Sequence, residues 1–290
     1  MIRVSVPATS ANCCVGFDCM GLALDWTAEF TFEKAEGLQI SGCPEEFCNE
    51  HNLVIQAFDL TAERYGRKRE GMKMHTSTDI PFARGLGSSS TCVAAGILAA
   101  DAWFDLHLND EQKLALATEM EGHPDNVAPA LFGGVCVCMN ADNKTWCEKL
   151  DTPAWKALAF VPDYEVSTPM ARKVLPNTLL FKEAVSQTGH ALVFEKALEA
   201  GREELLCAAC QDVLHEPYRM KLIPEYEQLK KEAADRGIPF WISGSGPTML
   251  AVSLDEKKLE VLEKRVQELY PGLYCRRLSL DLKGASARHV

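Results

Sequence analysis

The residues best suited to chemistry lie in one glycine- and serine-rich loop, residues 81 to 91, with the sequence PFARGLGSSST. An alternating strand pattern, Met72 to Thr78, precedes the loop, and an alanine-rich run, Cys92 to Leu106, follows it as a predicted buried helix. The loop therefore lies at a helix N-terminus, where four backbone N–H groups lack partners and the helix dipole favours an anion. Gly85 and Gly87 allow the backbone to approach a ligand, and the serines add hydroxyls. The pattern indicates a phosphate-binding loop.

The spelling of this loop excludes three better-known motifs. No lysine follows Gly87, as a Walker A loop requires, and Ser90 stands where a dinucleotide fingerprint needs a third glycine. Neither the loop nor the stretch from Ser243 to Gly246 spells the Gly-x-Ser-x-Gly of a hydrolase nucleophile. Taken alone, the loop also fits an ordinary capped helix start.

Charge and length narrow the class of protein. Thirty basic and 41 acidic side chains give a net charge of −11, which disfavours nucleic acid and anionic membranes as partners. A chain of 290 residues predicts about two domains. No apolar run approaches the ~20 residues of a membrane span, and the N-terminus lacks a signal-peptide core, so we expect a cytoplasmic enzyme of small-molecule chemistry.

The twelve cysteines do not follow a zinc or disulfide pattern. Cys13 and Cys14 are adjacent, and the Cys-x-x-Cys at Cys207 to Cys210 has no second pair to complete a zinc site. We expect reduced and mostly buried thiols.

Two further segments carry polar groups that could contact a substrate. The first strand pattern, Ile2 to Val6, is expected to end at Pro7, and the loop after it offers Asn12 and Asp18. Asp18 is a natural partner for an ammonium group, although a self-bonded turn also fits this loop.

The second polar segment is Glu121 to Ala130, EGHPDNVAPA, which follows a predicted helix. A carboxylate here could hold Mg²⁺ opposite the loop serines, and Asn126 could orient a hydroxyl. A polar loop with a hydrogen-bonded histidine is the alternative interpretation.

The rest of the chain interleaves helices and strands without strict alternation, which predicts an α+β fold. Asn52 is a plausible cap for one helix, and Ser167 for another that carries Arg172. The last predicted strand is Tyr274 to Leu282.

Three separated motifs resemble the superfamily of galactokinase, homoserine kinase, mevalonate kinase and phosphomevalonate kinase, the GHMP kinases. They are PFARGLGSS at residues 81 to 89, PATSAN at residues 7 to 12 and SGSGP at residues 243 to 247. Within that superfamily, Gly16-Phe-Asp18 and HPDNVAP at residues 123 to 129 are similar to homoserine kinase. The resemblance runs nearly from end to end.

The resemblance implies a two-domain α+β GHMP kinase fold. Residues 1–152 would form a ribosomal-protein-S5-domain-2-like domain with a left-handed βαβ unit, and residues 153–290 a ferredoxin-like domain, with the active site between them. It also implies phosphorylation of the L-homoserine hydroxyl by ATP with Mg²⁺, a step of threonine biosynthesis. A homodimer, a different small alcohol as substrate, and a non-catalytic nucleotide-binding role stay open.

The resemblance also implies roles for individual residues. Asn52 would lie on the adenine side, and the ATP phosphates would contact Pro81, Phe82, Ala83, Arg84, Gly85, Leu86, Gly87, Ser88, Ser89, Ser90 and Thr91. Ser88 and Glu121 would hold the metal, with Glu119 as a rival carboxylate. The substrate would contact Asn12, Asp18, Asn126, Thr168, Arg172 and Arg219. Asn126 would hold the hydroxyl for direct attack, and Asp125 is an alternative general base.

Overall fold

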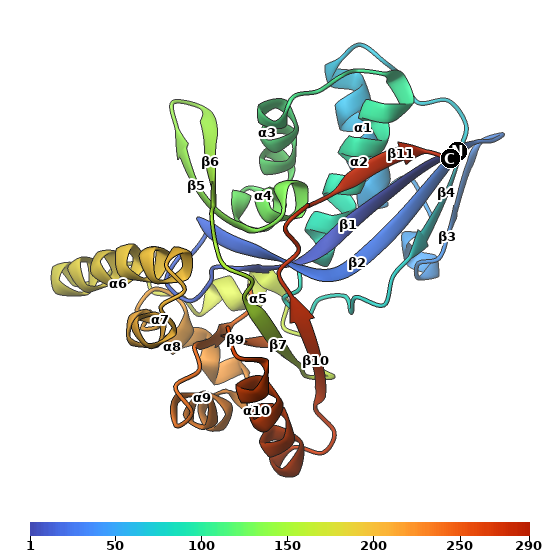
Figure 1. Cartoon of the computed structure of the whole chain (residues 1–290). Coiled ribbons are helices and arrows are strands. Elements are labelled where there is room, and N and C mark those ends of the chain that lie inside the picture. The colour runs from blue at the N-terminus through green and yellow to red at the C-terminus, as the bar shows by residue number, and fades with distance from the viewer.

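The computed structural model describes residues 1–290 and contains two sheets (Figure 1). The first takes all its strands from the first half of the chain except β11, and the second takes all its strands from the second half. The first sheet has the order β11-β1-β2-β4-β3, and β5 pairs with both β2 and β6. Its strands are β1 (Ile2–Ala11), β2 (Met20–Lys34), β3 (Leu38–Ser41), β4 (Met72–Ser77), β5 (Val135–Ala141), β6 (Lys144–Leu150) and β11 (Ser286–His289). The long β1–β2 pair is antiparallel and alternates buried with more exposed residues along its first half, as the sequence predicts.

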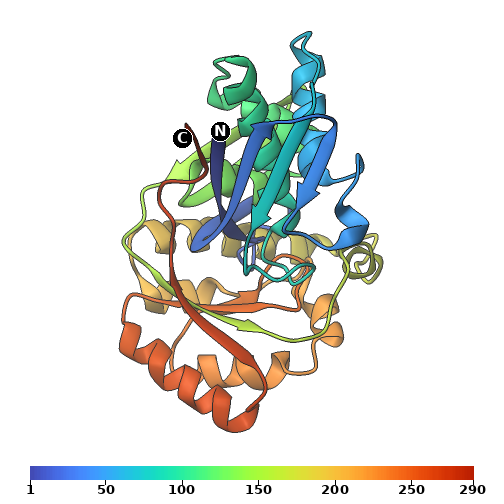
Figure 2. The ribbon, with the colours of Figure 1, turned by 90° about the vertical axis from the view of Figure 1, so that its right-hand side faces the viewer.

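Helices cover one face of this first sheet (Figure 2). They are α1 (Leu53–Arg64), α2 (Ser88–Phe104), α3 (Asp110–Glu121) and α4 (Pro124–Phe132). A Cβ on Gly96 would lie 2.3 Å from the carbonyl oxygen of Val54, so only glycine permits α2 to pack so closely on α1. This packing fixes the position of α2, whose first turn faces the site.

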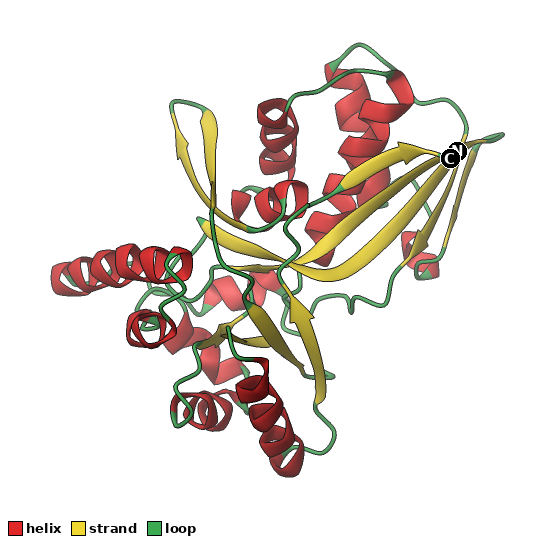
Figure 3. Cartoon of the chain, viewed as in Figure 1, coloured by secondary structure: helices red, strands yellow, loops and turns green.

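The second sheet has the order β10-β7-β9-β8, and all its pairs are antiparallel. Its strands are β7 (Lys156–Val161), β8 (Phe240–Ile242), β9 (Met249–Ser253) and β10 (Tyr274–Ser279). The helices of this half are α5 (Thr168–Lys173), α6 (Phe181–Glu199), α7 (Glu203–Ala209), α8 (Glu216–Arg219), α9 (Tyr226–Ala234) and α10 (Glu256–Leu269). Figure 3 shows the ends of several strands of the two sheets approaching each other near the centre of the molecule. The predicted α+β, two-domain fold with a ferredoxin-like second half is confirmed.

Two local predictions are wrong, and one alternative interpretation is wrong in part. Strand β1 does not end at Pro7 but continues to Ala11, because the ladder with β2 shifts register after Pro7 and then resumes. The alternative interpretation of the segment after Glu121 is correct in its hydrogen-bonded histidine but not in the loop, since Pro124 begins helix α4. The predicted helix after the phosphate loop begins at Ser88 and not at Cys92.

The chain also ends differently from the prediction. Strand β10 stops at Ser279, and β11 then returns to pair with β1 in the first sheet. Residues 286–289 therefore lie with the first sheet, although the division predicted from the sequence puts them with residues 153–290. Because of this return, the two termini lie together in Figure 1.

All twelve cysteines are free thiols, as expected. Only five of them are buried, since six are half-buried and Cys48 is exposed, so the expectation of mostly buried thiols is wrong. None of the helices is long and apolar enough to cross a membrane.

Candidate active site

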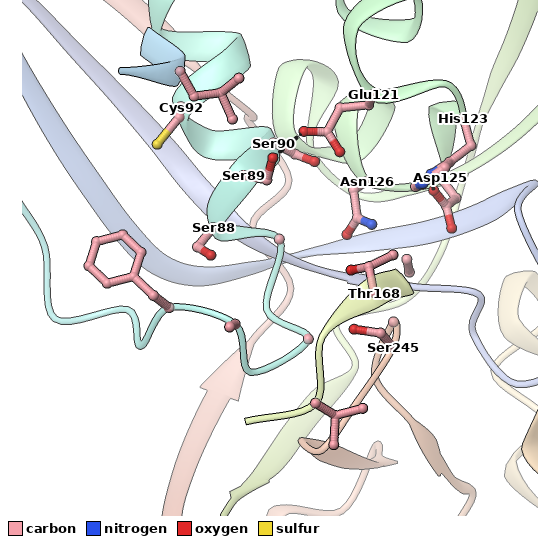
Figure 4. Close-up of a pocket in the computed structure, with 18 of the residues that line it drawn as sticks. Ser88, Ser89, Ser90, Cys92, Glu121, His123, Asp125, Asn126, Thr168 and Ser245 are labelled. Atoms are coloured by element: carbon pink, nitrogen blue, oxygen red, sulfur yellow. Dashed lines mark hydrogen bonds and ion pairs between the residues drawn. The ribbon is translucent and has the colours of Figure 1, made fainter. Parts of the chain in front are cut away.

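A cavity of about 530 Å³ lies between the two sheets and receives side chains from both halves of the chain. The first half contributes the phosphate loop, Asn12 and Asp18 from the segment after β1, and polar groups of α3 and α4. The second half contributes Val166, Thr168, Arg172, Arg219, Gly244 and Ser245. Figure 4 shows the loop serines, Glu121, Asn126 and Thr168 around this space.

The predicted phosphate loop lines the cavity through its glycines and serines. Gly87 is the N-cap of α2, in the left-handed region at φ 67°, and no side chain caps the helix. The first amides of α2 are therefore left without a side-chain partner at the cavity wall, which is an anion-binding arrangement. Ser88, Ser89 and Ser90 belong to the first turn and line the same wall.

The turn at residues 243 to 247 packs against this loop. Ser243 Oγ donates to the Gly85 carbonyl oxygen at 2.6 Å, and the Thr248 amide donates to the Arg84 carbonyl oxygen at 3.2 Å. A Cβ on Gly85 would lie 2.2 Å from the Ser243 carbonyl oxygen, so glycine is required there. The second half of the chain thereby fixes the shape of the phosphate loop.

Four residues of the predicted phosphate-contacting stretch do not line the cavity: Pro81, Arg84, Leu86 and Thr91. The Arg84 guanidinium donates to the carbonyl oxygens of Pro162 and Asp163 and pairs with Glu165 at 3.2 Å. Leu86 and Thr91 are buried. The Arg84 side chain therefore anchors the loop to the second half of the chain, and the phosphate contacts predicted for these four residues stay predictions.

Glu121, at the end of α3, is the carboxylate that faces the phosphate loop. Its Oε1 accepts from Ser89 Oγ at 2.5 Å, as the dashed line in Figure 4 marks. The rival Glu119 instead forms a two-bond ion pair with Arg64 at 2.8 and 2.7 Å and does not line the cavity. Ser88 lines the cavity beside Ser89, so hydroxyl and carboxylate oxygens, the donors that Mg²⁺ prefers, gather at this point.

Asn126 and its neighbours stand at the N-terminus of α4. Asn126 Oδ1 accepts from the buried Thr9 Oγ1 at 2.7 Å, and Asn126 lines the cavity. Asp125 is buried and bonded to Nδ1 of His123, and this hydrogen bond raises the pKa of His123 above its usual range. Asp125 also lines the cavity, and its alternative role as a general base stays a prediction.

Asp18 and Arg172 meet across the cavity from opposite halves of the chain. The Arg172 guanidinium donates to the two carboxylate oxygens of Asp18 at 3.0 and 2.8 Å. Ser167 caps the short helix α5 and so places Thr168 and Arg172 at the wall. The structure thus brings together two side chains that were predicted to bind the substrate. In this structure they form an ion pair with each other.

Arg219 is the second guanidinium of this region and is almost fully buried. Burial, followed by repulsion from Arg172, lowers its pKa to about 10. It donates to the carbonyl oxygens of Gly244 at 2.9 Å and Ala171 at 3.3 Å. The buried carboxylate of Glu216 anchors the helix that carries it, because Glu216 accepts from the amide of Ile242 at 2.7 Å.

Asn12 lines the cavity, yet its amide mainly joins two loops. Its Nδ2 donates to the Gly244 carbonyl oxygen at 3.0 Å, and its Oδ1 accepts from the backbone amide of Asp18 at 3.0 Å. Asn12 itself has a left-handed backbone at φ 69°. Its predicted contact with substrate stays a prediction, while its role in orienting Asp18 is visible in the structure.

The other end of the cavity is more apolar. Asn52 caps α1 by accepting from the Val54 amide at 3.0 Å, and it lines the cavity as predicted. Sequence reasoning missed its companions there, which are Cys43, Phe47, Leu53, Val54 and Cys92. It also missed Thr9 and Ser245, although the PATSAN and SGSGP motifs contain both.

The fold and this inter-domain site define a GHMP kinase. The chain matches the family models of the GHMP kinases N terminal domain at residues 52–134 and of the GHMP kinases C terminal domain at residues 194–272. A mevalonate kinase structure in complex with R-mevalonate, from L. major, has the same fold, with a TM-score of 0.74 over 97% of this chain and 96% of that one at 15% identity.

Proteins with higher sequence identity to this chain identify its family within the GHMP kinases. The homoserine kinase of Clostridium beijerinckii is 40% identical over 99% of this chain and 98% of its own length. That of Caldicellulosiruptor bescii is 40% identical over 92% of this chain and 88% of its own. The crystal structure of homoserine kinase from Cytophaga hutchinsonii has a TM-score of 0.87 at 28% identity, over 99% of this chain and 97% of that one. The chain therefore belongs to the homoserine kinase family.

Proposed function

We propose that this enzyme transfers the γ-phosphoryl group of ATP to the side-chain hydroxyl of L-homoserine. The observation that carries the proposal is one cavity that joins an anion-binding helix N-terminus to an acid and two guanidinium groups. The first feature suits a nucleotide triphosphate, and the second suits a zwitterionic amino acid. The membership of the homoserine kinase family supports the same substrates.

We infer the nucleotide end of the cavity from the chemistry of the residues that line it. The triphosphate would lie on the amides and hydroxyls from Gly85 to Ser90, and the adenine would lie toward Asn52 and Phe47. Ser88 and Glu121 would hold Mg²⁺ through oxygen atoms. When bound, the ion would neutralise charge on the phosphates during transfer.

At the substrate end, a zwitterion would bind by replacing the ion pair between Asp18 and Arg172 with two ion pairs of its own. The ammonium group of homoserine would replace Arg172 beside Asp18, and Arg172 would then be free to contact the carboxylate near Thr168. Arg219 stays fixed by two carbonyl oxygens and supplies a second positive charge. Mevalonate and galactose have no ammonium group, so they would leave Asp18 without this partner.

Asn126 would hold the acceptor hydroxyl in line with the γ-phosphorus. The oxygen of homoserine forms the new bond to phosphorus, the bond to the bridging oxygen of ADP breaks, and the hydroxyl proton passes to a transferred phosphoryl oxygen. Alignment and charge neutralisation can carry most of this reaction, because its transition state is loose.

The test is ADP formation with ATP and each of four alcohols: homoserine, threonine, mevalonate and galactose. We expect turnover with homoserine to exceed that with the other three. Equal turnover without any alcohol, or preference for mevalonate or galactose, would reject the proposed substrate. ATP binding without turnover on any of the four would favour a non-catalytic protein.

A further inference from the structure

We propose that Thr9 is a positioning residue for phosphoryl transfer, which turns the amide of Asn126 so that its NH₂ group, and not its carbonyl oxygen, faces the acceptor hydroxyl. The inference rests on the proposed function of this site. It concerns a buried hydroxyl on strand β1 that does not line the cavity itself.

The hydrogen bond between the two side chains carries the inference. Thr9 Oγ1 donates to Asn126 Oδ1 at 2.7 Å, between residues that are 117 positions apart in the sequence. Thr9 is fully buried, so water does not compete for its hydroxyl. No protein group accepts a hydrogen bond from Asn126 Nδ2, and Asn126 is only half-buried, so this donor is available at the cavity.

Thr9 also contacts the phosphate loop. Its backbone amide donates to the Leu86 carbonyl oxygen at 3.1 Å. A Cβ on Gly87 would lie 1.9 Å from Thr9 Oγ1 and 3.2 Å from Asn126 Oδ1, so the loop, Thr9 and Asn126 pack without a gap. One residue therefore fixes the distance between the anion-binding amides and the group that meets the hydroxyl.

This orientation has a chemical consequence. An asparagine that presents N–H groups can donate to the oxygen of the acceptor hydroxyl, but it cannot accept the proton of that hydroxyl. The donated bond leaves one oxygen lone pair to attack phosphorus and directs the O–H bond away from Asn126. Without Thr9, the amide would be free to turn and offer its oxygen to the hydroxyl proton instead.

The first experiment compares Thr9→Val and Thr9→Ser by steady-state kinetics with homoserine and ATP. Valine keeps the shape of threonine and removes the hydroxyl, while serine keeps the hydroxyl. We expect kcat to fall by about 10- to 100-fold in Thr9→Val, as for other small misplacements of a reacting group. The KM for ATP should change little, and Thr9→Ser should recover most of kcat.

Thr61→Val is the matched control for the loss of a buried threonine hydroxyl. Thr61 is fully buried in α1, and its Oγ1 donates to the carbonyl oxygen of Ala57 at 2.8 Å. Thermal unfolding of both valine variants measures the structural cost. The proposal requires Thr9→Val to lose kcat well beyond Thr61→Val at a comparable loss of Tm.

A double-mutant cycle with Asn126→Ala tests whether Thr9 acts through Asn126. We expect Thr9→Val to reduce kcat in the wild type and to have almost no further effect in the Asn126→Ala background. Multiplicative effects, or an unchanged kcat in Thr9→Val, would overturn the positioning role while leaving homoserine as the substrate. A wild-type enzyme without turnover on homoserine would instead overturn the proposed function, and the positioning role with it.

Discussion

Asp18 shows how one side chain can be assigned from its surroundings. Its carboxylate is only partly buried, its backbone amide is held by Asn12, and both its oxygens accept from Arg172. The ion pair keeps both charges in the cavity and oriented toward each other. The ammonium group of a zwitterionic ligand can replace Arg172 beside Asp18, and the carboxylate of the ligand can replace Asp18 beside Arg172.

Asp18→Asn should weaken binding of homoserine and leave the nucleotide unaffected. We expect its KM for homoserine to rise by about 10- to 100-fold, since hydrogen bonds to charged groups contribute about 1.5–3 kcal/mol. The KM for ATP should stay within about 2-fold, because Asp18 is hydrogen-bonded to Asn12 and Arg172 and to no residue of α2. Asp105→Asn, at the exposed end of α2, is the control for loss of one acidic charge. An equal rise of both KM values would contradict the assignment.

Substitution can also distinguish Glu121 from Glu119 as the carboxylate that holds the metal. Glu121→Gln should lower kcat and raise the Mg²⁺ concentration at half-maximal rate, because its carboxylate meets the phosphate loop. Glu119→Gln should only break the exposed pair with Arg64, which contributes about 1 kcal/mol of stability or less. Titration of Mg²⁺ at fixed ATP distinguishes them. A larger rise of the half-maximal Mg²⁺ concentration in Glu119→Gln than in Glu121→Gln would identify Glu119 as the metal ligand.

His123 should make stability depend on pH. Its bond to Asp125 raises its pKa in the folded state, so the stabilisation is complete below the unfolded-state pKa of about 6.5 and disappears as pH rises through the folded-state value. The Tm of His123→Gln should therefore lie further below that of wild type at low pH than at high pH. Thermal unfolding of both proteins across this range measures the difference, and a constant gap would show that the His123–Asp125 bond is not linked to protonation.

At the scale of elements, the N-terminus of α2 requires a glycine at residue 87 for two reasons, its left-handed backbone and the close approach of Thr9. Gly87 has φ 67°, and a Cβ there would meet Thr9 Oγ1 at 1.9 Å. Gly66 has nearly the same φ, 66°, but nothing lies within 4 Å of its Cβ position. A comparison of alanine substitutions at Gly87 and Gly66 therefore separates the effect of backbone strain from that of a steric clash at the site.

Gly87→Ala should abolish most turnover, while Gly66→Ala should only lose stability. The left-handed backbone costs roughly 1–2 kcal/mol in each variant. Only Gly87→Ala must also move Thr9 or the phosphate loop, so its KM for ATP should rise and its kcat should fall. Isothermal titration with a non-hydrolysable ATP analogue and Tm measurements check both variants. Similar ATP affinity in the two would show that the close approach at Gly87 is not needed.

The sequence predicted those elements whose signals are local. Caps at Asn52 and Ser167 mark real helix starts, and Gly87 with the serines after it marks the first turn of α2 at the cavity. It did not predict that β1 passes Pro7 or that β11 returns to β1, because both depend on pairing with distant strands. Helix α4 is only 9 residues long and contains Pro129, so its helical pattern is weak in the sequence.

The site was predictable only in part for the same reason. Asp18, Glu121 and Arg172 have charges that suggest ligands, so a motif comparison finds them. Thr9 looks like an ordinary strand residue, and its bond to Asn126 spans 117 positions of sequence. Phe47 lies at the end of a single 3₁₀ turn, Glu45–Phe47, which has no distinct sequence pattern. Tertiary structure alone brings these residues to the cavity.

At the scale of the whole molecule, the cavity exists only because the two halves of the chain close on each other. The Gly244 carbonyl oxygen accepts from Asn12 of the first half and from Arg219 of the second. Ser243 bonds to Gly85 of the phosphate loop at the same point. ATP and an amino acid would therefore share one cavity, so that a phosphoryl group can pass directly between them.

Transfer to the amino acid is the central claim, and ³¹P NMR of a mixture of enzyme, ATP, Mg²⁺ and L-homoserine tests it directly. We expect the γ-phosphate signal of ATP to be replaced by a phosphomonoester signal that is split by the neighbouring CH₂ protons. ADP signals should grow in equal amount. Conversion of the γ-phosphate to inorganic phosphate, or no change unless a different alcohol is added, would contradict the account.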